Sequence, residues 1–344
     1  RACGDDGHPG GEHAQRIAER PGREVGRPGA GGRVGRHGGS LQRPGGAAIV
    51  RHAAVRVRRQ GYPARADKMR RMSLTPAFTA LGSGPTVLLL HGIGGGHLAF
   101  APQVETLAAA GYRAVAWDMP GYGHSAPIEP YTFKGLAQRC IALIDALQCP
   151  DVVLVGHSMG GMVAQEVVAR HPQRVSRLVL AGTSAAFARH GSGRSADDWA
   201  RQFVAERTAP LDAGQGMEGM AQTLVPRMVG PGALPEGLRL AEHCMGGVPE
   251  ATYRRALECL TGFDRQSALA AIAVPTLLVA GEFDRVAPPA LMRRMADQIP
   301  RSRYVELPGI GHLMNLEAPE AFDGQLLDFL ADTAADAARP SALH

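Results

Sequence analysis

The sequence predicts an α/β protein built around a mostly parallel β-sheet that is flanked by helices. Short apolar runs alternate with segments whose apolar residues recur at helical spacing, a rhythm typical of strands joined by crossover helices. Several runs, such as 86–90, are apolar at nearly every position, as expected for strands buried on both faces. Polar and glycine-rich motifs follow these runs, at the edge where open parallel sheets bind ligands.

Seven strands are expected in chain order, each followed closely by a glycine. They span 77–80, 86–90, 113–117, 152–155, 175–181, 276–280 and 303–307. Five helices are expected on the faces of the sheet, because apolar residues recur every three or four positions. They span 102–110, 133–147, 159–170, 288–298 and 317–332. Gly111 ends the first helix and Pro288 opens the fourth, at positions that these residues favour.

This rhythm breaks over residues 183–268. Short amphipathic pieces, separated by Gly and Pro turns, span 197–208, 217–228, 235–242 and 251–261. An insertion of ~80 helical residues in a regular sheet protein is best explained as a lid. We therefore expect a core formed by 72–182 and 269–337, with a helical lid at 183–268. Four methionines offer the lid an adaptable apolar surface: Met217, Met220, Met228 and Met245.

Residues 1–71 differ in composition from the rest of the chain. They hold 15 glycines, and 16 Arg or Lys against 6 Asp or Glu, a net charge of +10. Such a low-complexity, Gly/Arg-rich tail buries too little surface to offset its ordering entropy, so we expect it to be disordered. The chain begins with Arg1, while Met69 and Met72 precede the first recognisable strand. We hypothesise that the natural protein starts at one of these methionines, which truncation at Met72 would test.

Charge, hydropathy and cysteine usage narrow the classes of partner. The 273 residues after the tail hold 21 basic and 26 acidic residues, a net −5, which argues against a nucleic-acid partner. The apolar runs fall short of the ~18 residues of a membrane helix, and no signal-peptide pattern is evident, so we expect a cytoplasmic protein.

Five cysteines without a C-x-x-C pair indicate free thiols, not a disulfide framework or a metal site. A homo-oligomer stays open.

The strongest single motif is Gly156-His157-Ser158-Met159-Gly160. An apolar run precedes it and a helical pattern follows it, so Ser158 is expected at the apex of a sharp strand-to-helix turn. Glycines flank Ser158 because side chains at those two positions would collide. Such a turn holds the hydroxyl clear of the backbone, beside the first N–H groups of a helix.

Ser158, Asp284 and His312 each follow an expected strand, in the order nucleophile, acid and histidine. A serine hydroxyl needs a base to take its proton while it attacks a carbonyl carbon. Histidine titrates near ~6.5, which suits His312 to this task, and Asp284 would hold its tautomer and stabilise the imidazolium. The backbone N–H groups of Ile93 and Met159 are candidates for an oxyanion hole.

Five motifs in this order resemble the α/β-hydrolase fold family over about residues 75–335. The motifs are His91-Gly92, residues 118–125, residues 156–161, Gly281-Glu282-Phe283-Asp284 and Gly311-His312. The resemblance implies an eight-stranded sheet, a helical lid after the sixth strand and no cofactor. It also implies a structural role for His91.

Other polar residues near these motifs are interpreted as structural residues or as weaker candidates for the site. Asp118, His124 and His157 are expected to stabilise turns, and His97 either lines the pocket or is a solvated loop residue. Glu282 is an alternative to Asp284 as the acid of the site. Asp264 is a more distant alternative.

The residue types at two positions limit which kind of bond the protein is expected to cleave. Ser158 argues against related dehalogenases and epoxide hydrolases, which carry aspartate there. C–C hydrolases of ring-cleavage products usually carry tryptophan where this chain has Leu313, whereas enol-lactone hydrolases resemble residues 311–322. We expect hydrolysis of a carboxylic ester or lactone of a small, largely apolar substrate. A C–C hydrolase, a cofactor-free haloperoxidase and a ligand receptor on a hydrolase scaffold stay open as alternatives.

Overall fold

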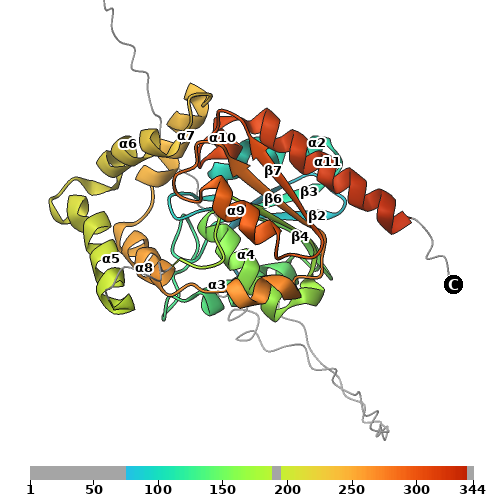
Figure 1. Cartoon of the computed structure of the whole chain (residues 1–344), viewed down its shortest axis with the longest axis horizontal. Coiled ribbons are helices and arrows are strands. Elements are labelled where there is room, and N and C mark those ends of the chain that lie inside the picture. The colour runs from blue at the N-terminus through green and yellow to red at the C-terminus, as the bar shows by residue number, and fades with distance from the viewer. Residues whose placement is uncertain (1–74, 188–194, 339–344) are drawn as a thin grey trace, which may run out of the picture. The chain divides into compact units, whose positions relative to one another are not determined.

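A computed structural model describes residues 75–187 and 195–338, which contain one seven-stranded sheet in the order β1-β3-β2-β4-β5-β6-β7 (Figure 1). The strands are β1 (Phe78–Leu81), β2 (Thr86–Leu90), β3 (Arg113–Trp117), β4 (Val152–His157), β5 (Val175–Ala181), β6 (Thr276–Gly281) and β7 (Ser302–Leu307). β1 pairs antiparallel with β3, and the other five pairs are parallel. The predicted mostly parallel sheet is confirmed, and each strand lies within two residues of its expected bounds.

Alternate residues of the central strands enter two hydrophobic cores, one on each face of the sheet. In β2, Leu88 and Leu90 belong to the first core, whereas Val87 and Leu89 belong to the second. All four side chains are fully buried, as the two-residue period of a strand covered on both faces requires.

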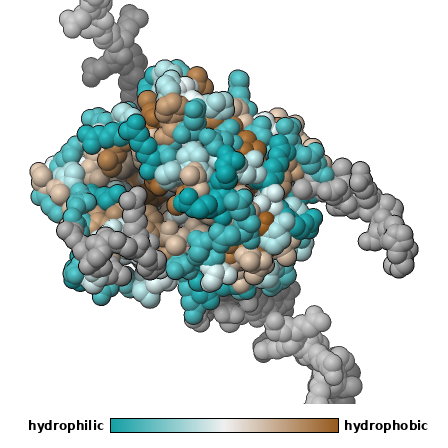
Figure 2. All heavy atoms as spheres, in the orientation of Figure 1, coloured by the Kyte–Doolittle hydropathy of each residue, from teal (hydrophilic) through white to brown (hydrophobic). Residues whose placement is uncertain are grey.

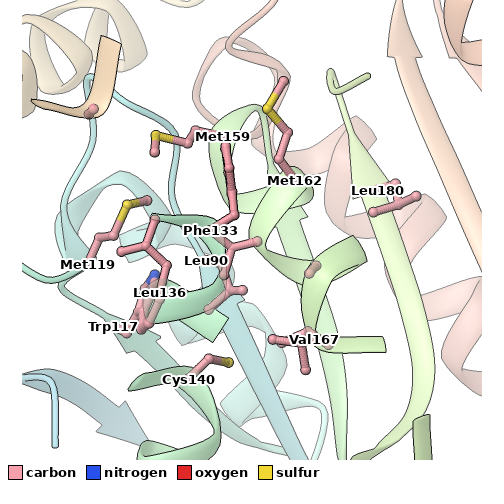
Figure 3. Close-up of a cluster of buried hydrophobic side chains, with 14 of the residues drawn as sticks. Leu90, Trp117, Met119, Phe133, Leu136, Cys140, Met159, Met162, Val167 and Leu180 are labelled. Carbon is pink, nitrogen blue, oxygen red and sulfur yellow. The ribbon is translucent and has the colours of Figure 1, made fainter. Parts of the chain in front are cut away.

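Helices cover both cores. The first core receives α3 (Phe133–Ala146), α4 (Met159–Arg170) and α9 (Pro289–Ala296), and the second receives α2 (Ala101–Ala109) and α11 (Pro319–Ala338). Figure 3 shows Leu90, Trp117 and Leu136 gathered in the first core, with Met159 and Met162 at the start of α4. The packing therefore anchors the start of α4 directly above the end of β4.

Four helices lie between β5 and β6 and gather on one side of the sheet, at the left of Figure 1. They are α5 (Ala196–Asp212), α6 (Gly216–Met228), α7 (Pro235–Gly246) and α8 (Glu250–Thr261). The expected helical insertion is therefore present, but it follows the fifth strand of the described chain instead of the sixth. The described residues form seven strands and not the eight that the resemblance implies. The expected tail 1–71 lies outside the described residues.

One expected helix is divided in two. The sequence pattern predicts a helix over 317–332, whereas the structure has a short α10 (Met314–Glu317) and then α11, which starts at Pro319. Proline disfavours helical geometry in the preceding residue, and Ala318 accordingly adopts φ −144° and ψ 69°. The break makes Glu317 the last residue of its own short helix.

Two expectations about the chain as a whole can be compared with the described residues. No helix among them is both long and apolar enough to cross a bilayer. Cys140, Cys149, Cys244 and Cys259 are free thiols, as the cysteine spacing predicts. Cys3 lies outside the described residues.

The close contact between α4 at Gly160 and β2 at Leu90 leads to a prediction about stability. A Cβ at Gly160 would lie 2.0 Å from the carbonyl oxygen of Leu90, so Gly160→Ala is expected to lower the free energy of unfolding by about 1–3 kcal/mol. Gly324→Ala in α11 is the matched control, because a Cβ there meets no atom within 4 Å; it is expected to stabilise by about 0.5–1 kcal/mol. Urea unfolding measures both, and wild-type stability in Gly160→Ala would contradict this packing.

Candidate active site

Ser158 lies in a strained turn between β4 and α4. Its backbone has φ 54° and ψ −120°, a region that costs a residue with a side chain of the order of 1–3 kcal/mol. Two hydrogen bonds oppose this strain: the Ser158 N–H donates to Ala181 O at 2.9 Å, and Thr183 Oγ1 donates to Ser158 O at 2.8 Å. Gly92 gives the turn space, since a Cβ there would lie 3.0 Å from Ser158 Cβ.

The structure brings Ser158, His312 and Asp284 into one hydrogen-bonded chain. His312 Nε2 lies 3.0 Å from Ser158 Oγ, and His312 Nδ1 lies 2.8 Å from Asp284 Oδ2. With the proton on Nδ1, the imidazole donates to the carboxylate and accepts from the hydroxyl, so both contacts are satisfied. His312 is buried after β7 and Asp284 is buried after β6. Such a chain can remove the hydroxyl proton and hold the resulting imidazolium.

Asp284 is held as a carboxylate by its surroundings. Burial alone would raise the pKa of Asp284, but the nearby His312 and the N–H groups of Val286 and Ala287 hold this pKa below its ordinary value. The two N–H groups donate to Oδ1 at 2.8 and 2.9 Å, which leaves Oδ2 for the imidazole. Each oxygen of the carboxylate therefore has a separate task.

A cavity of about 290 Å³ adjoins Ser158 and His312. Its wall is mainly apolar, and much of it comes from the helices between β5 and β6, including Leu224, Leu257 and Leu260. Figure 2 shows a hollow lined by hydrophobic residues where these helices meet the rest of the protein. The reacting groups thus face a pocket suited to a small apolar molecule.

A comparison with family models decides the family. Residues 85–319 match the model of the α/β-hydrolase fold. The chain belongs to this family.

Relatives and solved structures agree with this placement in the α/β-hydrolase family. The chain is 30% identical to 3-oxoadipate enol-lactonase 2 of Acinetobacter baylyi, over 62% of this chain and 76% of the relative. A thermophilic esterase from Thermogutta terrifontis shares 29% identity and a TM-score of 0.66, covering 74% of this chain and 93% of that one. The enol-lactonase from Burkholderia xenovorans shares 28% identity and a TM-score of 0.63, covering 74% and 96%. Other relatives carry names of carbamate hydrolases and non-heme bromoperoxidases, so membership alone does not define the substrate.

The two backbone groups expected to bind an oxyanion are available for a ligand. Within the described part of the chain, neither the Ile93 N–H nor the Met159 N–H donates a hydrogen bond to protein. Met159 is the first residue of α4, where backbone N–H groups have no partner inside the helix. Ile93 is held in its loop by Tyr122, whose hydroxyl donates to Ile93 O at 2.9 Å. This role of Tyr122 could not be predicted from local sequence, because its partner lies 29 residues away.

His91 and Asp118 have the structural roles that were expected of them. His91 Nδ1 donates to Gly92 O at 2.8 Å, and His91 Nε2 accepts from Met119 N–H at 2.9 Å. Burial lowers the pKa of His91 to about 4, in keeping with a neutral ring. Asp118 accepts from the backbone N–H and from Nδ1 of His97, at 3.0 and 2.9 Å. His97 therefore stabilises the loop and does not line the cavity.

The alternative acids lie away from the imidazole. Glu282 Oε2 accepts from Gly309 N–H at 2.8 Å, and Asp264 Oδ1 accepts from Gln266 N–H at 3.0 Å. His312 contacts Asp284 instead. Asp264 therefore stabilises a local turn, and Glu282 joins the loop after β6 to the loop after β7.

The methionines of the insertion divide between two places. Met228 and Met245 line the cavity, together with Met162 of α4. Met217 and Met220 belong to the first core and do not line the cavity, so the adaptable apolar surface expected of the four methionines is provided there by Met228 and Met245. In the described residues, no group of three or more His, Cys, Asp or Glu could hold a metal ion.

The side chain of His157 also holds the backbone of His312 in place. His157 Nε2 donates to His312 O at 2.8 Å. Burial, followed by the charge of His312, lowers the pKa of His157 to about 3. The ring of His157 is therefore uncharged at neutral pH.

These buried histidines predict a loss of stability in acid. Histidines of the unfolded chain take up protons from about pH 6.5, whereas His91 and His157 resist protonation down to about 4 and 3. Stability is therefore fully present above pH 6.5 and falls below it, each histidine contributing about 1.4 kcal/mol per pH unit. In His157→Gln the slope between pH 6 and 4 is expected to decrease by about that amount.

Urea unfolding over this pH range measures the slope. His124→Gln is the control, because His124 is exposed, and it is expected to keep the wild-type slope. An unchanged slope in His157→Gln would contradict the assignment of a neutral buried ring.

Proposed function

We propose that the protein is a serine hydrolase that cleaves a carboxylic ester or lactone of a small, largely apolar substrate. The observation that carries this proposal is the chain Ser158–His312–Asp284, with contacts of 3.0 and 2.8 Å, at the wall of a mainly apolar cavity. The names of the enol-lactonase and esterase relatives support the same class of reaction.

The proposed reaction begins with attack of Ser158 Oγ on the carbonyl carbon, while His312 Nε2 takes the hydroxyl proton. The Ile93 and Met159 N–H groups stabilise the tetrahedral oxyanion, and one such donor is typically worth about 3 kcal/mol. The protonated imidazole then gives its proton to the leaving oxygen, which leaves an acyl-enzyme. Water, activated by the same imidazole, attacks the acyl carbon and releases the acid.

The helices α5–α8 are proposed to act as the lid over this reaction, and residues 72–182 and 269–337 as the core. Support comes from the cavity wall, to which all four helices contribute: Phe203, Leu224, Met245 and Tyr253 are examples. An apolar wall excludes water from the acyl group, which strengthens the interaction with the oxyanion. Leu313, directly after His312, adds to that wall.

Ser158→Ala is expected to abolish both turnover of p-nitrophenyl butyrate and labelling by a fluorophosphonate, with kcat reduced by about 10⁵–10⁶-fold. The reason is that no other hydroxyl lies within hydrogen-bonding distance of His312 Nε2 among the described residues. Stopped-flow kinetics and gel fluorescence measure the two losses. Turnover at the wild-type rate in Ser158→Ala would refute the proposal.

The role of Asp284 has its own test, with a matched carboxylate as control. Asp284→Asn is expected to lower kcat by about 10⁴-fold, because an amide cannot hold the same imidazole tautomer. Glu282→Gln, whose carboxylate contacts Gly309 instead, is expected to stay near the wild-type rate. Equal losses in the two variants would contradict the assigned acid.

A substrate panel separates the remaining alternatives. Esters, enol-lactones and dienones ranked by kcat/KM, each against Ser158→Ala, should place an ester or enol-lactone first. A dienone in first place would favour C–C hydrolysis. A single slow turnover, with a ligand-dependent rise in melting temperature, would favour a receptor.

A further inference from the structure

Glu317, the last residue of α10, has a completely buried side chain. Its Oε2 accepts from the N–H groups of Gly311 at 2.7 Å and Gly230 at 2.8 Å, and its Oε1 accepts from the Leu313 N–H at 2.7 Å. A buried carboxylate is costly unless donors compensate it, and here three backbone N–H groups do so.

Two of these donors belong to the neighbours of His312. Gly311 precedes His312 and Leu313 follows it, so one carboxylate holds the backbone on both sides of the imidazole. The N–H of His312 itself donates to Met228 O at 2.7 Å. The direction of the His312 side chain therefore depends on these three backbone contacts.

The third donor belongs to the segment that joins α6 to α7. This segment, residues 228–234, lies against the loop that carries His312. The N–H of Gly232 donates to Gly309 O at 2.9 Å, and the N–H of Leu234 donates to Glu317 O at 2.9 Å. A Cβ at Gly230 would lie 2.2 Å from Gly309 O, so the two backbones are in direct contact.

The charge of Glu317 also acts on His312. Burial raises the pKa of Glu317, whereas the three N–H donors and the nearby His312 oppose that rise. Attraction between two groups is mutual, so the carboxylate stabilises the protonated imidazole. Among the described residues, Asp284 after β6 and His157 at the end of β4 are the other titratable side chains that hydrogen-bond to His312.

We propose that Glu317 is a positioning residue for His312, which orients the imidazole through both of its neighbours and links it to the lid segment 228–234. The inference rests on the proposed hydrolysis by Ser158, and it extends the triad to a buried carboxylate that touches no substrate. A movement of the lid segment would act on the base through this carboxylate.

Glu317→Gln tests this role, because the amide fills the same space but cannot accept from all three N–H groups and carries no charge. With p-nitrophenyl butyrate, kcat per folded molecule is expected to fall by about tenfold to a hundredfold with KM nearly unchanged. The acid limb of kcat/KM should move to lower pH, since removing a negative charge disfavours the imidazolium. Asp323→Asn is the control: Asp323 is also buried, and it bonds Gln103 at 2.8 Å.

Glu317→Asp separates reach from charge. It keeps the charge but is one methylene shorter, so it should lose kcat while its acid limb stays at the wild-type pH. If Glu317→Gln does not fold, this variant decides, and a wild-type kcat per folded molecule would overturn the proposal. In folded Glu317→Gln, a wild-type kcat or an unmoved acid limb would overturn it. The proposed function fails separately, if wild-type protein shows no turnover that Ser158→Ala abolishes.

Discussion

The hydrogen bond between Ser158 and His312 joins residues that are 154 positions apart in the chain, and the rest of the structure serves to hold it. Parallel strands bring both residues to one edge of the sheet. The turn at Ser158 is strained, and it is held by two hydrogen bonds to the backbone of Ser158 and by the close packing of α4 against β2 at Gly160. The hydroxyl is therefore presented by a rigid strand-turn-helix unit and not by a mobile loop.

The buried ionisable side chains around the site have hydrogen-bond partners that suit their charge state. His91 and His157 are buried as neutral rings, each bonded to a backbone carbonyl. Asp284 and Glu317 are buried carboxylates, and backbone N–H groups donate to both. His312 is the group that takes up and releases a proton in the proposed reaction. This arrangement lets one imidazole act as base and acid in turn while its surroundings stay fixed.

Much of the fold was predictable, because buried strands and glycine turns have local signals. The meeting of Ser158, Asp284 and His312 was predictable for the same reason, since each follows a strand within a recognisable motif. Glu317 was not, because the sequence pattern places it at the start of an expected helix, whereas its burial depends in part on Gly230, which is 87 positions away. Packing in the insertion was also hidden, since helical spacing alone cannot tell a methionine that lines the cavity from one that fills a core.

The central claim is that Ser158 carries the acyl group between two half-reactions. Intact-mass and peptide mass spectrometry, after rapid acid quench of a mixture with p-nitrophenyl butyrate, tests this most directly, because the fast leaving group lets the acyl-enzyme accumulate. One butyryl group is expected, on the peptide that contains Ser158. Continued turnover with no butyryl group on that peptide, or with the group on another residue, would contradict it.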